Sequence, residues 1–346
     1  MIFIDCVIYS LQKSGGITVY FNELIKRISL AYPASFLLSR DYVEAKRKWA
    51  GKDFFCPERY RDIDCDNYAL CHSSYYRISQ NKNVKNITTV HDFTYEKFVK
   101  GPARWVHSWQ KFRAIRYSEA IICISENTKQ DLLHYLPDVD QEKIFVIYNG
   151  VSDEYFPLDN QAAQVRKRYV LFVGARGGYK NFTLAINVIA QLKDIELLAV
   201  GGGQFSAKEL LILNQLIPNR FSHAGFATTE QLNILYNEAL CLLYPSSYEG
   251  FGIPIIEAMR AGCPVVAMNA SSIPEVAGDA AILVDKPEVA GFVDAINSLC
   301  NKEKINELRE LGFVQAAKFS WDETFRQTVA VYEHVLGHPL PKRIDE

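Results

Sequence analysis

Two glutamates, Glu249 and Glu257, lie eight residues apart in the stretch "YPSSYEGFGIPIIEAMRAGCPVV" (244–266). Gly250 and Gly252 lie between them and let the backbone N–H groups of a loop face an anion. Carboxylates accept hydrogen bonds, which is what sugar and ribose hydroxyls need. The same residues could instead hydrolyse a glycosidic bond, if the carboxylates converge to within ~5–10 Å. They could also form a surface loop and a helix cap without a ligand.

A second stretch, "VGARGGYKN" (173–181), follows an apolar run and carries two cations. Arg176 and Lys180 flank Gly177 and Gly178, so positive charge and a pliable backbone meet at the end of a predicted strand. This combination suits a diphosphate, and it favours a bound phosphate ester over hydrolysis by the two glutamates. A solvated turn with ordinary surface cations is the alternative.

The first half of the chain has a similar but weaker signal at Ser14-Gly15-Gly16. These residues follow the first apolar run and open a long amphipathic stretch. Gly15 and Gly16 would let the backbone approach an anion at a helix N-terminus. A tight turn without a ligand explains them equally well.

Histidines end two further predicted strands. His91-Asp92 lies at a strand end, and His72 follows another apolar run. A structural histidine with satisfied hydrogen bonds, beside a helix-capping aspartate, accounts for either position without chemistry.

Two other patterns bear on metals and cofactors. The segment "RDIDCDN" (61–67) contains Asp62, Asp64 and Asp66 in DxD spacing, which can hold a divalent metal carrying a nucleotide. It precedes a strand, so a solvated loop is the better interpretation. The run "VGGGQF" (200–205) is not GxGxxG, and a dehydrogenase is therefore unsupported. We expect no metal and no other cofactor.

Short apolar runs alternate with amphipathic stretches throughout, which predicts α/β units on parallel sheets. One helix is expected over 17–31, with Val19, Tyr20, Leu24, Ile25 and Ile28 on one face. The predicted strands lie in residues 2–9, 35–39, 68–73, 86–92, 120–125 and 144–150, and again in 169–175, 196–203, 221–226, 241–247, 264–268 and 281–285. Ligands of such sheets bind at the carboxyl ends of the strands.

The two series of strands predict two Rossmann-like domains with a cleft between them. A polar linker is expected over 153–168. The helix after Glu249 should begin near Pro254 and end at Gly262. Further helices are predicted over 287–300, 303–317 and 321–337. The expected domains are 1–155 and 156–320, followed by a terminal segment over 321–346.

Composition excludes some classes of protein. The formal net charge of the 346 residues is −2, which argues against a nucleic-acid binder. Residues 1–150 hold 21 Lys and Arg against 17 Asp and Glu, whereas residues 151–346 hold 17 against 23. The positive excess of the first half is compatible with an anionic membrane surface.

No run approaches the ~18–20 apolar residues of a membrane span, and the start lacks the basic region of a signal peptide. The eight cysteines form no CxxC pair or zinc spacing. Reduced, buried thiols in a cytoplasmic protein are the expected state.

Taken together, these motifs resemble glycosyltransferase family 4, whose members are retaining enzymes of the GT-B fold that use nucleotide-sugar donors. The most specific match is the E-x7-E arrangement from Glu249 to Glu257. "VGARGGYKN", "AGF", "VHD", "ISENTKQDL" and "VIYNGV" follow in the order of the family. "GGITVYFNEL" and "ARGGYKNF" most resemble bacterial O-antigen and capsule mannosyltransferases. The region between Tyr32 and His72, which usually meets the acceptor, has no family landmark.

The resemblance implies a role for each matching residue. Arg176 and Lys180 would hold the donor diphosphate, and Glu257 would accept hydrogen bonds from the ribose. Glu249, with the N–H groups near Phe251, Gly252 and Ile253, would hold the transferred sugar. Phe226 would lie beside the nucleobase, Gly15 and Gly16 near the phosphates, and His91 near the reacting carbon. The last helix would cross back to the first domain.

The implied function is transfer of a sugar, with mannose from GDP-mannose as the first expectation, to a lipid-linked saccharide acceptor. The protein would be cytoplasmic and loosely attached to the inner membrane face, with "KRKW" (46–49) among its contacts. UDP- or dTDP-sugars are alternative donors. The alternative functions are an epimerase or a phosphorylase with the same two-domain architecture, and a catalytically silent subunit that only binds a partner.

Overall fold

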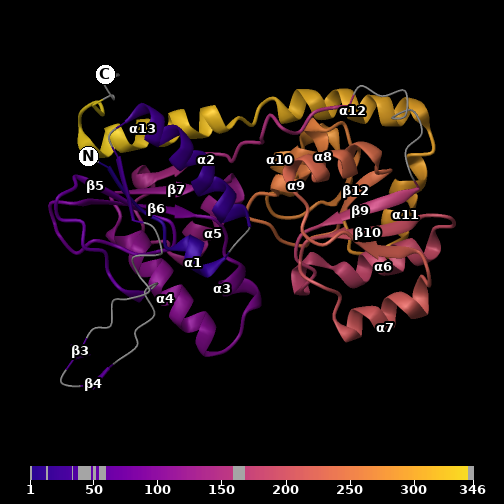
Figure 1. Ribbon diagram of the computed structural model, residues 1–346, viewed down its shortest axis with the longest axis horizontal. Coiled ribbons are helices and arrows are strands. Elements are labelled where there is room, and N and C mark those ends of the chain that lie inside the picture. Colours follow the sequence, from indigo (N-terminus) through magenta and orange to yellow (C-terminus); the bar gives the residue numbers. More distant parts are fainter. Residues whose placement is uncertain are drawn as a thin grey trace. The chain divides into compact units, whose positions relative to one another are not determined.

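The chain forms two compact units, seen in a computed structural model that describes residues 2–12, 15–32, 34–37, 48–49, 52–53, 60–158 and 168–341 (Figure 1). Unit 1 comprises Met1–Asn149 and Trp321–Glu346, and unit 2 comprises Gly150–Ser320. Ser14, Cys56, most of the predicted linker and the first half of "KRKW" lie outside the described residues.

Unit 1 is built on a six-stranded parallel sheet in the order β2-β1-β5-β6-β7-β8. Its strands are β1 (Ile2–Asp5), β2 (Ala34–Leu37), β5 (Leu70–Ser73), β6 (Lys85–Val90), β7 (Ala120–Cys123) and β8 (Ile144–Val146). A separate antiparallel pair joins β3 (Lys48–Trp49) to β4 (Lys52–Asp53). The helices are α1 (Ile8–Leu11), α2 (Gly16–Ala31), α3 (Thr94–Phe98), α4 (Pro102–Tyr117), α5 (Glu126–Tyr135) and α13 (Trp321–Leu336).

Helix α2 packs on the sheet of unit 1 through the face that carries Tyr20, Phe21, Leu24 and Ile28, all fully or almost fully buried. Val19, which we expected on this face, is 38% exposed. The buried positions follow the 20-21-24-28 spacing of one helical stripe, and position 19 falls at its solvent side.

Helix α13 completes the core of unit 1. It packs against α2, and its residues Trp321, Val329 and Tyr332 belong to the same buried cluster as Ile2 and Ile4 of β1. The last helix therefore returns to the first unit, as the family resemblance implied.

Unit 2 repeats the plan with a six-stranded parallel sheet in the order β11-β10-β9-β12-β13-β14. Its strands are β9 (Tyr169–Val173), β10 (Glu196–Val200), β11 (Phe221–His223), β12 (Cys241–Tyr244), β13 (Val265–Met268) and β14 (Ile282–Val284). The helices are α6 (Phe182–Gln191), α7 (Ala207–Leu216), α8 (Thr229–Glu238), α9 (Ile253–Arg260), α10 (Ile273–Ala277), α11 (Val289–Ser298) and α12 (Lys302–Ala316).

Each of the twelve apolar runs overlaps a strand, and the four helices predicted after residue 250 are present. Helix α9 has Pro254 in its first turn and Gly262 just beyond its end, as expected. Six of the seven described cysteines are buried thiols, whereas Cys300, contrary to expectation, is exposed. No helix in the described part of the chain has the length and apolar character needed to cross a membrane.

Candidate functional site

Two of the predicted residues of unit 2, Lys180 and Glu249, meet where the order of strands reverses. From β9 the chain builds β10 and β11 on one side, and then returns to place β12 on the other side of β9. The loops after β9 and β12 therefore leave the sheet next to each other. In open parallel sheets this reversal point is where ligands bind.

Lys180 and Glu249 meet at this point. The Lys180 Nζ donates to both carboxylate oxygens of Glu249, at 2.6 Å to Oε1 and 2.8 Å to Oε2. The side chains are 15% and 10% exposed, so the pair is largely shielded but still reachable from outside. A second contact fixes the two loops, because Ser247 N–H donates to the Tyr179 carbonyl at 2.8 Å. The structure thus joins two residues that the sequence places 69 positions apart.

Two serines after β13 hold the glutamate loop in shape. The Glu249 N–H donates to Ser271 Oγ at 2.8 Å, and Ser272 Oγ lies 2.9 Å from the carbonyls of both Glu249 and Phe251. Gly252 has a φ of 108°, which a residue with a Cβ rarely adopts. It immediately precedes α9, where Pro254 has no N–H and the Ile255 N–H already donates to the Gly252 carbonyl at 2.9 Å.

Glu257 lies one turn into α9, beside two tyrosines. The Tyr236 hydroxyl donates to Glu257 Oε2 at 3.0 Å, and Tyr155 also hydrogen-bonds to this carboxyl. Burial of the carboxyl group raises the pKa of Glu257 to about 7, against the lowering effect of the two tyrosine hydroxyls. The carboxyl group of Glu257 therefore loses its proton near neutral pH. The residue is partly exposed to solvent.

Arg176 is engaged elsewhere. Its Nε donates to Glu209 Oε1 at 2.9 Å, and its terminal nitrogens donate to the carbonyls of Gly201, Gly203 and Gln204 at 2.8–2.9 Å. The guanidinium also lies 4.8 Å from the ring centre of Phe205. Its side chain is only 4% exposed. In this structure Arg176 holds the glycine loop after β10, and a contact with diphosphate would have to replace some of these partners.

Phe226 follows β11 and Gly225, whose φ is 71°. Its ring is 74% exposed, which leaves its faces open for a planar group to stack on. The predicted neighbour of the nucleobase is therefore accessible.

In unit 1, Gly15 and Gly16 stand at the N-terminus of α2, just after β1 and α1. Both are exposed, and the first turn of α2 carries no acidic side chain. Four unpaired N–H groups at a helix start attract an anion, so the position suits the predicted role.

His91 and His72 differ in their hydrogen bonds. His72 is fully buried and satisfied, with Nδ1 2.6 Å from the Tyr332 hydroxyl and Nε2 2.8 Å from Thr89 Oγ1. His91 is 6% exposed, and its Nε2 has no hydrogen-bond partner in the described parts of the chain. Its ring packs edge-on against Tyr20. Burial lowers the pKa of His91 to about 4 and that of His72 to about 3, so both are neutral near pH 7.

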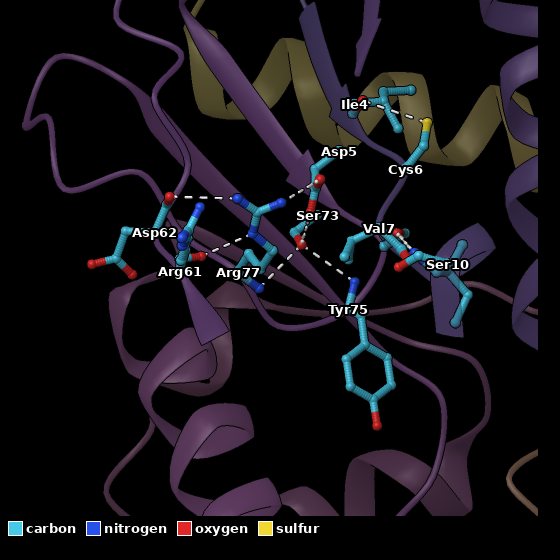
Figure 2. Close-up of polar contacts among 12 residues, drawn as sticks. Ile4, Asp5, Cys6, Val7, Ser10, Arg61, Asp62, Ser73, Tyr75 and Arg77 are labelled. Carbon is cyan, nitrogen blue, oxygen red and sulfur yellow. Dashed lines mark hydrogen bonds and ion pairs between the residues drawn. The ribbon is translucent and has the colours of Figure 1, made fainter. Parts of the chain in front are cut away.

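The strand order of unit 1 reverses between β1 and β5, and a buried ion pair fills that place (Figure 2). Arg77 donates to Asp5 Oδ1 at 3.0 Å, and Ser73 Oγ donates to Asp5 Oδ2 at 3.0 Å. The side chains of Arg77 and Asp5 are 2% and 0% exposed. Arg77 Nε also donates to the Arg61 carbonyl at 2.8 Å, which fixes the segment before β5.

The DxD segment lies next to this ion pair. The carboxylate of Asp62 receives two hydrogen bonds from Arg113, at 2.6 and 2.9 Å, so its oxygens are occupied by a cation of the chain itself. Asp64 and Asp66 are exposed, as expected for a solvated loop. Within the described ranges no three His, Cys, Asp or Glu side chains gather as metal ligands would. That catalysis needs no metal stays a prediction.

Comparison with known proteins identifies the class. HepE of Anabaena, solved in complex with UDP and glucose, superposes with a TM-score of 0.73 over 96% of this chain and 99% of HepE, at 15% sequence identity. The two parallel α/β units are thus those of the GT-B fold. The family described as "Glycosyltransferase Family 4" matches residues 34–155, and "Glycosyl transferases group 1" matches residues 158–312. Both models are of glycosyltransferases and together they match most of the chain, which confirms the resemblance to glycosyltransferase family 4.

Two curated relatives that this chain resembles are named mannosyltransferases. O-antigen chain mannosyltransferase B of Escherichia coli is 40% identical over 112 residues, which are 32% of this chain and 29% of that protein. The MMP alpha-(1->4)-mannosyltransferase of Mycolicibacterium hassiacum is 28% identical over 272 residues, 72% of this chain and 65% of that protein. The chain thus matches from under a third to about two thirds of the length of these relatives.

Sequence reasoning missed several residues that shape the site. Ser271 and Ser272 follow β13 at the carboxyl edge of the sheet. Their position just after a predicted strand could have marked them as candidates for the site. Tyr236 lies within α8, where nothing in the local pattern marks it as a partner of Glu257.

Proposed function

We propose that this protein transfers a hexose from a nucleotide-sugar donor to a lipid-linked saccharide, with retention of configuration at the anomeric carbon. Mannose from GDP-mannose is the preferred donor, and O-antigen, capsule or lipopolysaccharide synthesis is the preferred setting. The first two relatives are named mannosyltransferases, and one of them acts on O-antigen chains by name. HepE was solved with UDP and glucose, so a UDP- or dTDP-sugar is the alternative donor.

The observation that carries this proposal is the Lys180–Glu249 pair at the strand reversal of unit 2. One cation and one carboxylate lie between a glycine loop and the start of α9. A sugar diphosphate needs both groups, because its phosphates are anions and its sugar hydroxyls are donors. When a donor binds, Lys180 shifts from Glu249 toward the phosphate, and Glu249 is released to accept from the sugar.

The transfer then needs no nucleophile from the protein. The bond between the anomeric carbon and the leaving phosphate oxygen breaks, and a bond from the acceptor oxygen forms on the same face. The acceptor proton passes to the leaving phosphate oxygen. Lys180 stabilises the charge that grows on the phosphate, while Glu249 holds the sugar ring as it gains positive charge.

The remaining residues bind parts of the donor that do not react. Glu257 accepts from the ribose hydroxyls, and Phe226 stacks on the base. Arg176 contributes by holding the loop after β10, and it would reach the diphosphate only after leaving Glu209. His91 offers its unpartnered Nε2 to the sugar or acceptor.

The function is tested by incubating the purified protein with GDP-mannose, UDP-glucose and dTDP-glucose. We expect one donor to raise the melting temperature by mass action and to be hydrolysed slowly without an acceptor. The Glu249→Gln variant serves as the matched control. Donor binding without hydrolysis or transfer to any acceptor would favour the silent subunit. An inverted product anomer would overturn the retaining mechanism.

Metal independence needs its own assay. We expect EDTA to leave the rate of donor hydrolysis unchanged, because Lys180 already supplies the positive charge. A rate abolished by EDTA and restored by Mn²⁺ would contradict this, and Asp62 and Asp64 would be the first ligands to mutate.

A further inference from the structure

Helices α3 and α4 of unit 1 (Figure 1) carry large aromatic side chains that are exposed. Trp105 is 75% exposed and Trp109 is 60% exposed. They lie four residues apart on α4, so they share one face of the helix. Phe98, at the end of α3, is 44% exposed. Two tryptophans rarely stay in water on one helix face without a partner, because each has a large apolar area to bury.

The same segment is positively charged. Residues 97–118 contain no Asp or Glu. Four of its cations are neutralised by acids from outside the segment: Lys97 by Asp131, Lys111 by Glu96, Arg113 by Asp62 and Arg116 by Asp138. Lys100 and Arg104 are exposed and make no ion pair with a residue that the structure describes. These two unpaired cations are close in sequence to Trp105.

The inner side of α4 holds this face rigidly in place. Lys111 is fully buried, and its Nζ donates to Glu96 Oε2 at 2.6 Å and to the Asp92 carbonyl at 2.9 Å. His107 stacks on Tyr95 with ring centres 3.8 Å apart. The buried side of α4 is thus formed by His107, Gln110, Lys111, Ala114 and Ile115, and the two tryptophans lie outside it.

We propose that the exposed stretch from Phe98 to Trp109, with Lys100, Arg104 and Trp105 within it, docks on an anionic lipid bilayer. Indole rings settle at the level of the lipid headgroups, where one edge is apolar and the N–H meets water. The two cations meet anionic headgroups at the same depth. A second copy of the chain fits less well, because a twofold interface would set these unpaired cations against themselves. The inference rests on the proposed function only in that a lipid-linked acceptor gives the docking a purpose.

The test compares binding of the full chain to two kinds of vesicle. One kind is phosphatidylcholine alone, and the other has equal parts of phosphatidylcholine and phosphatidylglycerol. We expect binding to the anionic vesicles only, weakened by salt. Trp105→Ser/Trp109→Ser and Lys100→Gln/Arg104→Gln should each weaken it about tenfold or more. The control is Lys208→Gln/Leu211→Ser on α7, which removes an exposed cation and an exposed apolar side chain elsewhere and should bind like the unchanged protein.

Two further measurements keep the outcome clear. The ring of Trp109 lies 5.7 Å from the Arg113 guanidinium, so Trp105→Ser alone replaces the double variant if the latter melts early. Donor hydrolysis is measured for every variant and should not change. Hydrolysis without vesicle binding overturns the docking face and leaves the proposed function standing. Vesicle binding without hydrolysis supports the docking face and overturns the proposed function. Equal binding by all variants, or self-association through α4 without lipid binding, also overturns the proposal.

Discussion

The two units reverse their strand order at equivalent places, but they fill those places differently. In unit 1 the reversal between β1 and β5 holds Asp5 and Arg77, with side chains 0% and 2% exposed and further hydrogen bonds to neighbouring groups. In unit 2 the reversal between β9 and β12 holds Lys180 and Glu249, which are 15% and 10% exposed and lie close in sequence to Gly178 and Gly250. Both sites contain one cation and one carboxylate.

The difference shows that an ion pair at a strand end is not by itself a binding site. The Asp5–Arg77 pair is sealed, so it can only fix the backbone around it. The Lys180–Glu249 pair can exchange its partners for those of a ligand, because each group keeps a path to the outside. In unit 1 the candidates for chemistry lie instead at the end of β6 and at the start of α2. Mutating equivalent groups in the two units should therefore give different kinds of defect.

The largest effect is expected at Asp5. Asp5→Asn keeps the shape of the side chain but leaves the buried Arg77 without a counter-charge. Losing one partner of a buried pair costs about 3–5 kcal/mol of stability. Urea unfolding should show this loss as a lower free energy of unfolding. If the free energy of unfolding of the variant lies within about 1 kcal/mol of that of the unchanged protein, the prediction is wrong.

Glu249 should affect the reaction more than the fold. Glu249→Gln removes the charge that faces the distorting sugar, so kcat should fall ~10- to 1000-fold, equivalent to roughly 1.5–4 kcal/mol. Lys180→Ala should give a similar loss. Because the two side chains are bonded to each other, the double variant should lose less than the product of the single effects. Steady-state kinetics of the three variants measure this, and strictly multiplicative losses would mean that the two act separately.

His91 is the test within unit 1. His91→Asn removes the one ring nitrogen that has no partner among the described residues, so kcat should fall ~10- to 100-fold, equivalent to one hydrogen bond to a charged group. The melting temperature should stay within a few degrees. Since the pKa of His91 is about 4, the effect should be the same from pH 6 to pH 8. An equal rate for variant and unchanged protein would show that His91 is structural, like His72.

The smallest effect is expected at Glu257. Glu257→Gln should raise the donor KM by ~3- to 10-fold with little change in kcat, because the ribose does not react. The pKa of about 7 adds a pH dependence. Above pH 7 the carboxylate accepts from the ribose more strongly, so the donor KM of the unchanged protein should fall as pH rises through 7. The Gln variant should show no such fall.

The same pKa predicts the sign of a stability change. Between pH 4.5 and 7 the folded protein keeps a proton on Glu257 that the unfolded chain has already released. The stability contributed by this group therefore falls as pH rises through that window and stays constant above it. Thermal melts of the Glu257→Gln variant should lack this part of the slope. An unchanged slope would mean that the carboxyl is ionised throughout.

The sequence predicted most of the fold, because each strand of these sheets is a short apolar run and each run is visible locally. The sequence also predicted that Glu249, Glu257 and Lys180 lie at the edge of the second sheet where its strands have their carboxyl ends. It could not show that Lys180 bonds to Glu249 or that Arg176 bonds to Glu209, since partners 69 and 33 residues apart leave no local pattern. Helix α4 escaped notice for another reason. Its tryptophans face outward and its Lys111 faces inward, the reverse of the usual amphipathic order.

The return of α13 to unit 1 also affects the order in which the chain can fold during its synthesis. Trp321, Val329 and Tyr332 belong to the core of unit 1, so the ribosome supplies them only after all of unit 2 has been made. At the usual rates of translation, unit 2 takes roughly 10–35 s to emerge. During that time unit 2 is continuous and free to fold, whereas the nascent unit 1 lacks the helix that packs against α2 and completes its buried cluster. The half-built first unit is therefore the part of the nascent chain that most needs a chaperone.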